Sequence, residues 1–320
     1  MKKITAVFFA WALAAVLVAP AVAQEAAQEK KQPVGDIEIV IVEDSKYPQG
    51  KAFEGLTLGL AQYANMNPKV TTMTEKKARS NKKIKKIMDE HKLDVLPLYL
   101  LKKTKNVQEK FGEDVNKGYL RDAGEYYIVP PQTPEFVFTK RATKPNVLEL
   151  FVMSQCPYGV MAENKIIEAY KAGKLPKDKQ IKIRYIVSYN AENDTFQSLH
   201  GQAEWEEDAR QLVIAKYFPE KFWDYMEIRN DMYQSKKWGW ILAAKEVGLN
   251  PDEIERLMPE GKAMLKEEAK YGEGINSSPT FLWEGKVKVD TNSLSTKPGF
   301  EFFNPNANNG NAAPVPAGSC

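Results

Sequence analysis

The chain has 320 residues, enough for two ordinary domains, and 43% of them are hydrophobic. Its 45 basic and 42 acidic side chains leave a net charge of +3, which argues against nucleic acid as a general partner. Two cysteines are too few for a disulfide-stapled scaffold, so stability must come from hydrophobic cores.

The N-terminus has the pattern of a signal peptide. Residues 1–23 start with a methionine and two lysines, continue as an apolar run to Pro20, and end in Ala-Val-Ala. This pattern predicts cleavage after Ala23 and a periplasmic or secreted protein, with no stable membrane insertion after cleavage. An uncleaved membrane anchor is the alternative. Residues 24–35 are polar and are expected to be a disordered leader. Cleavage of the signal peptide would remove Lys2 and Lys3 and lower the net charge from +3 to +1.

Residues 36–132 are predicted to form an α/β domain without cysteine. A strand, a helix and a second strand are followed by a lysine-rich helix, a bend at Pro97 and a third strand. The turn after the first strand, residues 43–46, has the sequence Glu-Asp-Ser-Lys and no strong nucleophile. The lysine-rich helix carries seven basic side chains between Lys76 and Lys86. They indicate either a solvated helix face or a contact with an acidic lipid or protein.

Residues 133–146 are expected to be a proline-punctuated linker around one short strand, and residues 147–303 a second α/β domain. This domain is predicted to begin with a buried strand, a helix and a half-buried strand. A helical insertion at about 195–271 follows, with breaks at Pro219, near Gly248 and near Pro259. A hairpin then closes the domain, and residues 304–320 are rich in Asn, Ala, Pro and Gly and are predicted to be a flexible tail.

Cys156 is the main candidate for chemistry. It follows the apolar run at 148–153 and directly precedes Pro157, which is favoured in the first turn of a helix. The strand would bring the thiol to the surface, and the helix N-terminus would stabilise its thiolate. A buried structural cysteine is the alternative.

The run Cys156-Pro157-Tyr158-Gly159, together with the later Ser278-Pro279-Thr280, resembles the thioredoxin superfamily. The helical insertion between the second strand and the Pro279 loop resembles the branch of periplasmic disulfide oxidoreductases. The resemblance covers 147–303 well and 36–132 loosely. It implies two thioredoxin-like domains in tandem, the first redox-inactive and the second with the helical insertion. An unrelated α/β domain is the alternative for residues 36–132. It also implies a cis bond before Pro279, with that loop against the sulfur of Cys156. The second active-site cysteine of the family is Gly159 here.

A second local resemblance involves His200. The stretch at 198–208, with His200, Gly201 and Glu204, resembles the Cys-Gln-His-Gly-x-x-Glu-Cys-x-x-Asn signature of the lysosomal thiol reductases. The cysteines of that signature fall on Ser198, Trp205 and Val213, so its disulfides cannot form. His200 is a candidate for tuning the thiol, and a helix cap or a packed polar residue is the alternative.

These features predict an exported thiol–disulfide oxidoreductase or isomerase-like protein with one nucleophilic cysteine. Without a thiol at position 159, a mixed disulfide between Cys156 and a substrate would persist until another thiol attacks it. Three outcomes are open: a small thiol resolves the mixed disulfide, the protein acts as an isomerase or traps its substrate, or Cys320 resolves it. A tail of this length spans roughly 20–25 Å, so Cys320 is a possible resolving thiol, although it could equally stay exposed or pair with a second molecule.

The expected partners are thiol- or disulfide-containing proteins or small thiols. No cofactor is expected, and no metal, because two distant cysteines and two separate histidines lack ligand spacing. The alternative function is a non-enzymatic, chaperone-like protein that binds peptides, with the aromatic residues between Tyr217 and Trp240 lining a groove or simply forming a core. Substrate, redox direction and oligomeric state stay open.

Overall fold

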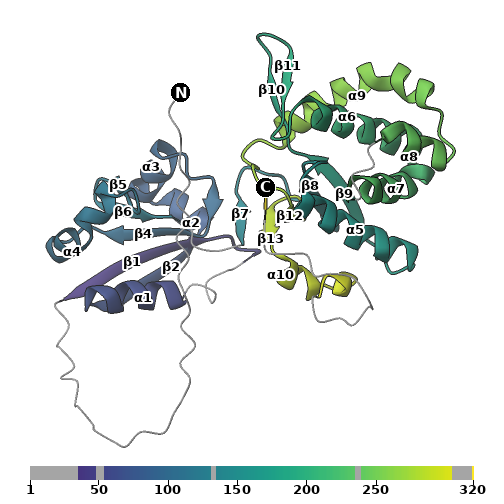
Figure 1. Cartoon of the computed structure of the whole chain (residues 1–320). Coiled ribbons are helices and arrows are strands. Elements are labelled where there is room, and N and C mark those ends of the chain that lie inside the picture. The colour runs from purple at the N-terminus through teal and green to yellow at the C-terminus, as the bar shows by residue number, and fades with distance from the viewer. Residues whose placement is uncertain (1–34, 48–53, 131–134, 235–238, 305–318) are drawn as a thin grey trace, which may run out of the picture.

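The computed structural model describes residues 35–47, 54–130, 135–234, 239–304, 319 and 320. The expected signal peptide, all of the leader but Gly35, and residues 305–318 of the tail lie outside these ranges. The described chain is a mixed α/β structure with two large sheets, each covered by its own helices (Figure 1).

The first sheet has the strand order β2-β1-β4-β6-β5. β1 pairs parallel with β2 and antiparallel with β4, and β4 pairs antiparallel with β6. The strands are β1 (Asp36–Glu43), β2 (Asn67–Thr74), β4 (Leu98–Lys102), β5 (Arg121–Ala123) and β6 (Tyr126–Val129). The helices around it are α1 (Glu54–Ala64), α2 (Glu75–Ser80), α3 (Lys82–Glu90) and α4 (Lys105–Asn116).

Alternate residues of β1 bury themselves on opposite faces of this sheet. Ile37, Ile39 and Ile41 share a core with apolar residues of α1 and α4. Val40 and Val42 pack with residues of α2 and α3 on the other side. Because side chains alternate along a strand, the continuous apolar run of β1 requires helices on both faces.

The lysine-rich segment forms two helices where the sequence predicted one. Asn81 caps the second helix, since its side chain accepts hydrogen bonds from the backbone N–H groups of Lys83 and Ile84. An asparagine in this role favours a new helix start over a continuous helix. The lysines of this segment are exposed, and Lys83 pairs with Glu125 at 2.8 Å, as on an ordinary solvated face. A contact with an acidic partner stays a prediction.

The second sheet has the order β3-β7-β13-β12-β8-β9. β8 pairs parallel with β9 and antiparallel with β12, and β12 pairs antiparallel with β13. The arrangement β9-β8-β12-β13 therefore repeats that of β2-β1-β4-β6 in the first sheet. The strands are β3 (Val95–Leu96), β7 (Phe136–Phe138), β8 (Val147–Val152), β9 (Gln180–Tyr185), β12 (Thr280–Trp283) and β13 (Val287–Val289).

The short strand expected in the linker is β7, and it is part of the second sheet. β7 pairs with β13 on one side and with β3 on the other, and β3 directly precedes β4 of the first sheet. Figure 1 shows β7 near β13. The described part of residues 133–146 therefore belongs to the second sheet, where β7 pairs with the strand that continues through Pro97 into the first sheet.

Helices fill the chain between β9 and β12 and pack around their own core, with Tyr225, Met226 and Ile254 fully buried. The helices of the second part are α5 (Pro157–Lys171), α6 (Gln202–Tyr217), α7 (Phe222–Gln234), α8 (Trp240–Glu246), α9 (Pro251–Tyr271) and α10 (Thr291–Ser295), with 3-10 turns at Pro219–Lys221 and Glu301–Phe303. A two-stranded hairpin, β10 (Ser188–Asn190) and β11 (Thr195–Gln197), precedes α6.

The helix break predicted near Pro259 is wrong. α9 is continuous through Pro259 and Gly261. Gly261 lies so close to α6 that a Cβ atom would come within 2.8 Å of the carbonyl oxygen of Ala209. Pro259 cannot donate a backbone hydrogen bond within the helix, and the burial of Ile254 and Leu265 on the same helix offsets the free energy lost in this way.

The turn after β1 contacts the turn between β12 and β13. The side chain of Asp44 pairs with Lys286 at 3.0 Å, and Lys46 pairs with Glu284 at 2.6 Å. The hydroxyl of Tyr47 also donates to Glu284. Asp44 and Lys46, in the turn expected to be an inactive counterpart of the Cys156 turn, thus form ion pairs between the first sheet and the second.

Candidate functional site

Cys156 is the N-cap of α5 and lies at the end of β8, as the sequence predicted. All six residues of β8 are buried, and the chain turns at Ser154 and Gln155 before Pro157 starts the helix. The carbonyl of Cys156 accepts a hydrogen bond from the N–H of Val160 at 2.9 Å. Cys156 itself is fully buried, and its sulfur lies at the N-terminal end of a helix of 15 residues. The partial positive charge at that end favours a thiolate.

The Ser278 loop lies against this sulfur. The Ser278–Pro279 peptide bond is cis, and the carbonyl oxygen of Ser278 is 3.3 Å from the sulfur of Cys156. The buried hydroxyl of Ser278 accepts a hydrogen bond from the N–H of Met153 at 3.0 Å. Thr280 then begins β12 and pairs with Phe151 of β8. Hydrogen bonds and strand pairing therefore hold the two motifs together across more than a hundred residues of sequence.

Cys320 completes the site by forming a disulfide with Cys156. Their Cα atoms are 6.0 Å apart, although the two residues are separated by 164 positions in the sequence. The backbone of Cys320 also pairs with Ser278, donating its N–H to the Ser278 carbonyl at 3.0 Å and accepting from the Ser278 N–H at 3.4 Å. The disulfide and these backbone hydrogen bonds thus hold Cys320 at the site, which corresponds to one of the alternatives left open for this residue, a partner of Cys156.

Gly159 occupies a position with no room for a side chain. A Cβ atom there would lie 2.5 Å from the hydroxyl oxygen of Ser278 and 3.3 Å from the carbonyl oxygen of Met153. Pro157 is exposed and Tyr158 is half-buried. The missing side chain at position 159 therefore allows the close approach of the Ser278 loop to the first turn of α5.

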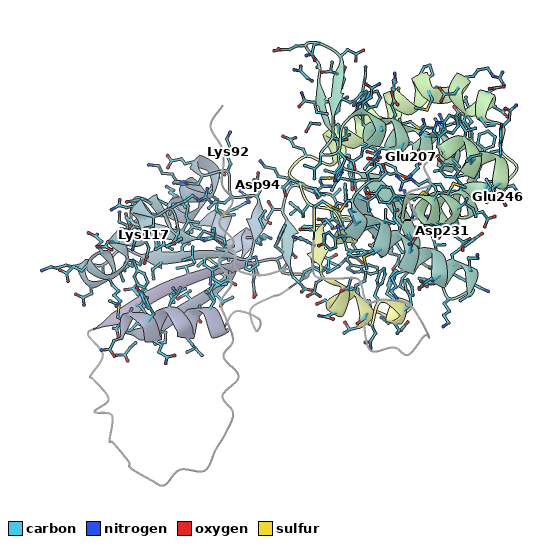
Figure 2. All side chains as sticks on the ribbon, viewed as in Figure 1. Lys92, Asp94, Lys117, Glu207, Asp231 and Glu246 are labelled. Atoms are coloured by element: carbon cyan, nitrogen blue, oxygen red, sulfur yellow. A yellow bond between two sulfur atoms is a disulfide. The ribbon has the colours of Figure 1, made fainter. Side chains whose placement is uncertain are left out.

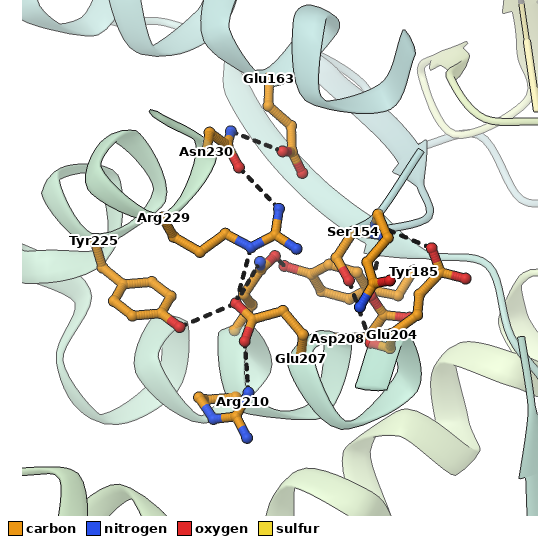
Figure 3. Close-up of polar contacts among 12 residues, drawn as sticks. Ser154, Glu163, Tyr185, Glu204, Glu207, Asp208, Arg210, Tyr225, Arg229 and Asn230 are labelled. Carbon is orange, nitrogen blue, oxygen red and sulfur yellow. Dashed lines mark hydrogen bonds and ion pairs between the residues drawn. The ribbon is translucent and has the colours of Figure 1, made fainter. Parts of the chain in front are cut away.

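Two buried carboxylates of α6 hold the turn that precedes Cys156 (Figure 3). Asp208 accepts the N–H of Ser154 at 3.2 Å, and Glu204 accepts the N–H of Gln155 at 2.9 Å. Their spacing of four residues places both on one side of the helix. The sequence indicated Glu204 only as part of a signature, and it gave no sign of the role of Asp208.

His200 contacts this turn only through Glu204. Its Nδ1 lies 2.7 Å from one carboxylate oxygen of Glu204, and its backbone N–H donates to the other oxygen at 3.0 Å. The contact confirms neither a helix cap nor direct tuning of the thiol. The carboxylate of Glu204 thus lies between the ionisable ring of His200 and the backbone of Gln155, the residue before Cys156.

A larger network of buried charges extends from these carboxylates toward α7 (Figure 3). Glu207 is bound by Arg210 at 2.5 Å and by Arg229 at 3.3 Å, and Figure 2 shows it inside the helical body. Burial would raise the pKa of Glu207, but the two guanidinium groups outweigh it and hold the pKa below its ordinary value. Burial raises the pKa of Glu163 to about 7, with partial compensation by Arg229. Burial also raises the pKa of Asp208 well above its usual range.

An open groove of about 690 Å³ lies beside the site, lined by Met153, Ile275 and Leu199 among other residues. Leu199 is one of the exposed large hydrophobic residues, at 63%. Of the aromatic residues proposed for a groove, Tyr225 and Phe222 are buried in the helical core. Tyr233 and Trp240 line a separate pocket of about 240 Å³, which Gln155 also lines. Trp238 lies outside the described residues.

Within the described ranges, no group of three or more His, Cys, Asp or Glu side chains is arranged to hold a metal ion. No helix in the same part of the chain is long and apolar enough to cross a membrane.

No family model matches the chain, and no curated protein matches it. Among solved structures, it is similar to the disulfide interchange protein DsbA of Klebsiella pneumoniae, with a TM-score of 0.39 and 15% identity over 52% of this chain and 88% of that one. DsbA of Pseudomonas aeruginosa gives a TM-score of 0.39 and 13% identity over 53% and 85% of the two chains. The thiol–disulfide oxidoreductase MdbA of Corynebacterium diphtheriae gives 0.32 and 19% over 49% and 83%.

Proposed function

We propose that this protein is an exported thiol–disulfide oxidoreductase or isomerase in which Cys156 and Cys320 form the redox pair. The observation that carries the proposal is the disulfide between them at the N-terminus of α5, against the Ser278–Pro279 loop. A disulfide partner brought from the end of the chain supplies the second thiol that position 159 lacks.

We further propose that the two sheets are tandem thioredoxin-like domains and that only the second carries chemistry. The repeated four-strand arrangement supports this division. In the first sheet, the turn after β1 has Asp44 and Lys46 where the second has its cysteine, and both are engaged in ion pairs with the second sheet. The helices between β9 and β12 would be the insertion.

The exchange reaction balances in two steps. The Cys156 thiolate attacks a substrate disulfide, forming a mixed disulfide and releasing one substrate thiolate. The Cys320 thiolate then attacks the Cys156 sulfur, forming the disulfide seen here and releasing the second substrate thiolate. The substrate gains two electrons, the protein loses two, and the protons of the two protein thiols pass to the two substrate thiolates. The reverse sequence oxidises a substrate dithiol.

Burial indicates which sulfur a reducing thiol reaches in the oxidised protein. Cys156 is fully buried, whereas Cys320 is only half-buried. Attack on the Cys320 sulfur would also expel Cys156 as the leaving group, and a thiolate at a helix N-terminus is a good one. Recycling by a small thiol or a dithiol protein is thus expected to pass through a mixed disulfide on Cys320.

Thiol labelling tests the proposal. The reduced mature protein is alkylated with iodoacetamide between pH 4 and 9, in Cys320→Ser to follow Cys156 and in Cys156→Ser to follow Cys320. We expect Cys156 to label with a midpoint below the ordinary thiol value of about 8.5 and Cys320 with a midpoint near it. A Cys156 midpoint at or above that value, or no labelling of the native protein, would refute a reactive thiol.

Peptide binding without exchange is a second candidate function, favoured by the groove beside Met153 and Ile275. A Cys156→Ser variant distinguishes the two. If it retains full protection of an unfolded client protein from aggregation while exchange is lost, binding is the main activity.

A further inference from the structure

The turn that presents Cys156 is held by two buried acidic side chains of α6. The consecutive N–H groups of Ser154 and Gln155 point to the carboxylates of Asp208 and Glu204, at 3.2 and 2.9 Å. The hydroxyl of Ser154 also donates to the backbone carbonyl of Glu204 at 3.2 Å. Both carboxylates are fully buried. Buried acids that bind the two residues before a reactive thiol determine both its position and its electrostatic environment.

Glu204 differs from its neighbours in the partner that faces it. Its carboxylate contacts the imidazole ring of His200, whose side chain is 33% exposed and can therefore exchange protons with solvent. The other ionisable groups around the turn are Asp208 on α6 and Tyr233 and Arg229 on α7. Tyr233 donates its hydroxyl to the Gln155 carbonyl, and the charge of Arg229 acts on both Asp208 and Tyr233.

We propose that Glu204 is a positioning residue for Cys156 and that His200 sets the net charge that Glu204 places beside the thiol. This inference rests on the proposed role of Cys156 in thiol–disulfide exchange. With His200 protonated, the pair is neutral. With His200 neutral, one negative charge remains beside the residue before Cys156, and it disfavours the thiolate.

Substitutions separate the charge from the position. Glu204→Gln keeps an oxygen that can accept the Gln155 N–H but removes the negative charge. Glu204→Ala removes both the charge and the acceptor. His200→Asn removes the ionisable ring and leaves the carboxylate uncompensated at every pH. Glu192→Gln, at an exposed position of the β10–β11 hairpin, is the control for loss of one carboxylate.

The experiment measures the iodoacetamide rate of reduced Cys156 against pH, in a Cys320→Ser background in which Cys156 is the single thiol. Below the midpoint of the thiol, we expect Glu204→Gln to react about three to ten times faster than its parent, since a unit charge at this range shifts a pKa by about half to one unit. His200→Asn should react slower than its parent at pH 5 to 6 and equally fast at pH 8, because histidine loses its charge in this interval. Glu192→Gln should match the parent.

The outcomes distinguish this inference from the proposed function. If the parent itself does not label, the proposed function fails. If the parent labels but Glu204→Gln follows the same pH profile, or His200→Asn differs from the parent by the same factor at every pH, the inference is overturned. Thermal unfolding of each variant identifies a loss of fold, and Glu204→Gln and His200→Asn decide the matter even if Glu204→Ala does not fold.

Discussion

Breaking the Cys156–Cys320 disulfide should lower the free energy of unfolding of the second part of the chain. The bond closes a loop with a sequence separation of 164, for which chain-entropy arguments give about 5 kcal/mol. Folded reduced protein regains part of this through its Cys156 thiolate. A thiolate stabilised by the N-terminus of a helix would return on the order of 1 kcal/mol at pH 7. We therefore expect the oxidised protein to be more stable than the reduced one by about 4 kcal/mol.

The same difference determines the redox direction. A fold that is more stable when oxidised favours the disulfide, so this pair should be more reducing than the same two cysteines in the unfolded chain. Since about 1.4 kcal/mol corresponds to about 30 mV for two electrons, the expected displacement is about 80–90 mV toward negative potential. Such a pair would act as a reductant or isomerase in preference to an oxidant.

Urea unfolding of oxidised and reduced protein measures the difference. Every tryptophan after Trp11 lies between Trp205 and Trp283, so tryptophan fluorescence reports on the second part of the chain alone. Cys320→Ser should match the reduced protein under both conditions. Equal stabilities would refute the loop-closure argument, and a reduced protein that is the more stable would also point to an oxidant.

Two more predictions concern the buried carboxyl group of Glu163 and the half-buried sulfur of Cys320. Glu163 has a pKa of about 7, above its ordinary value, so the folded state keeps a proton that the unfolded state releases and stability should fall as the pH rises from about 4.5 to 7. Glu163→Gln should remove this loss. Between pH 4 and pH 8, the free energy of unfolding of the variant should therefore rise by up to about 3 kcal/mol relative to that of the parent, as measured by urea unfolding. Oxidised protein mixed briefly with glutathione and quenched with acid should carry the adduct on Cys320 by peptide mass mapping; an adduct on Cys156 would contradict the order of attack.

The parts of the site that the sequence predicted are those with local signals. The apolar strand that ends at Cys156, the proline in the first turn of the helix, and the serine–proline step before β12 each depend on neighbouring residues only. The alternation of buried residues in β1 is local in the same sense. Short-range rules of backbone geometry are sufficient for such features.

The parts that it could not predict depend on contacts between distant segments. The sequence makes Cys320 a possible resolving thiol but leaves its pairing open, because the backbone hydrogen bonds between Ser278 and Cys320 join segments that are far apart in the chain. The carboxylates of Glu204 and Asp208 face the turn before Cys156 only once α6 has packed beneath it. Likewise α9 passes through Pro259 because burial against α6 outweighs the local preference of proline.

Position 159 shows why a second cysteine cannot simply be restored to this site. A Cβ atom on residue 159 would collide with the Ser278 hydroxyl, which cannot rotate away without giving up its hydrogen bond from Met153.

Gly159→Ala should therefore destabilise the protein by about 1–3 kcal/mol, the usual range for overpacking. Ser278→Ala removes the colliding oxygen, so Gly159→Ala should be less harmful in that background, and a double-mutant cycle by urea unfolding measures the coupling. Strict additivity of the two substitutions would show that the glycine is required for some other reason. If the coupling is found, Gly159→Cys alone should not give a disulfide between positions 156 and 159 in high yield, and the chain depends on Cys320 because the cis-proline loop occupies the space that a nearer thiol would need.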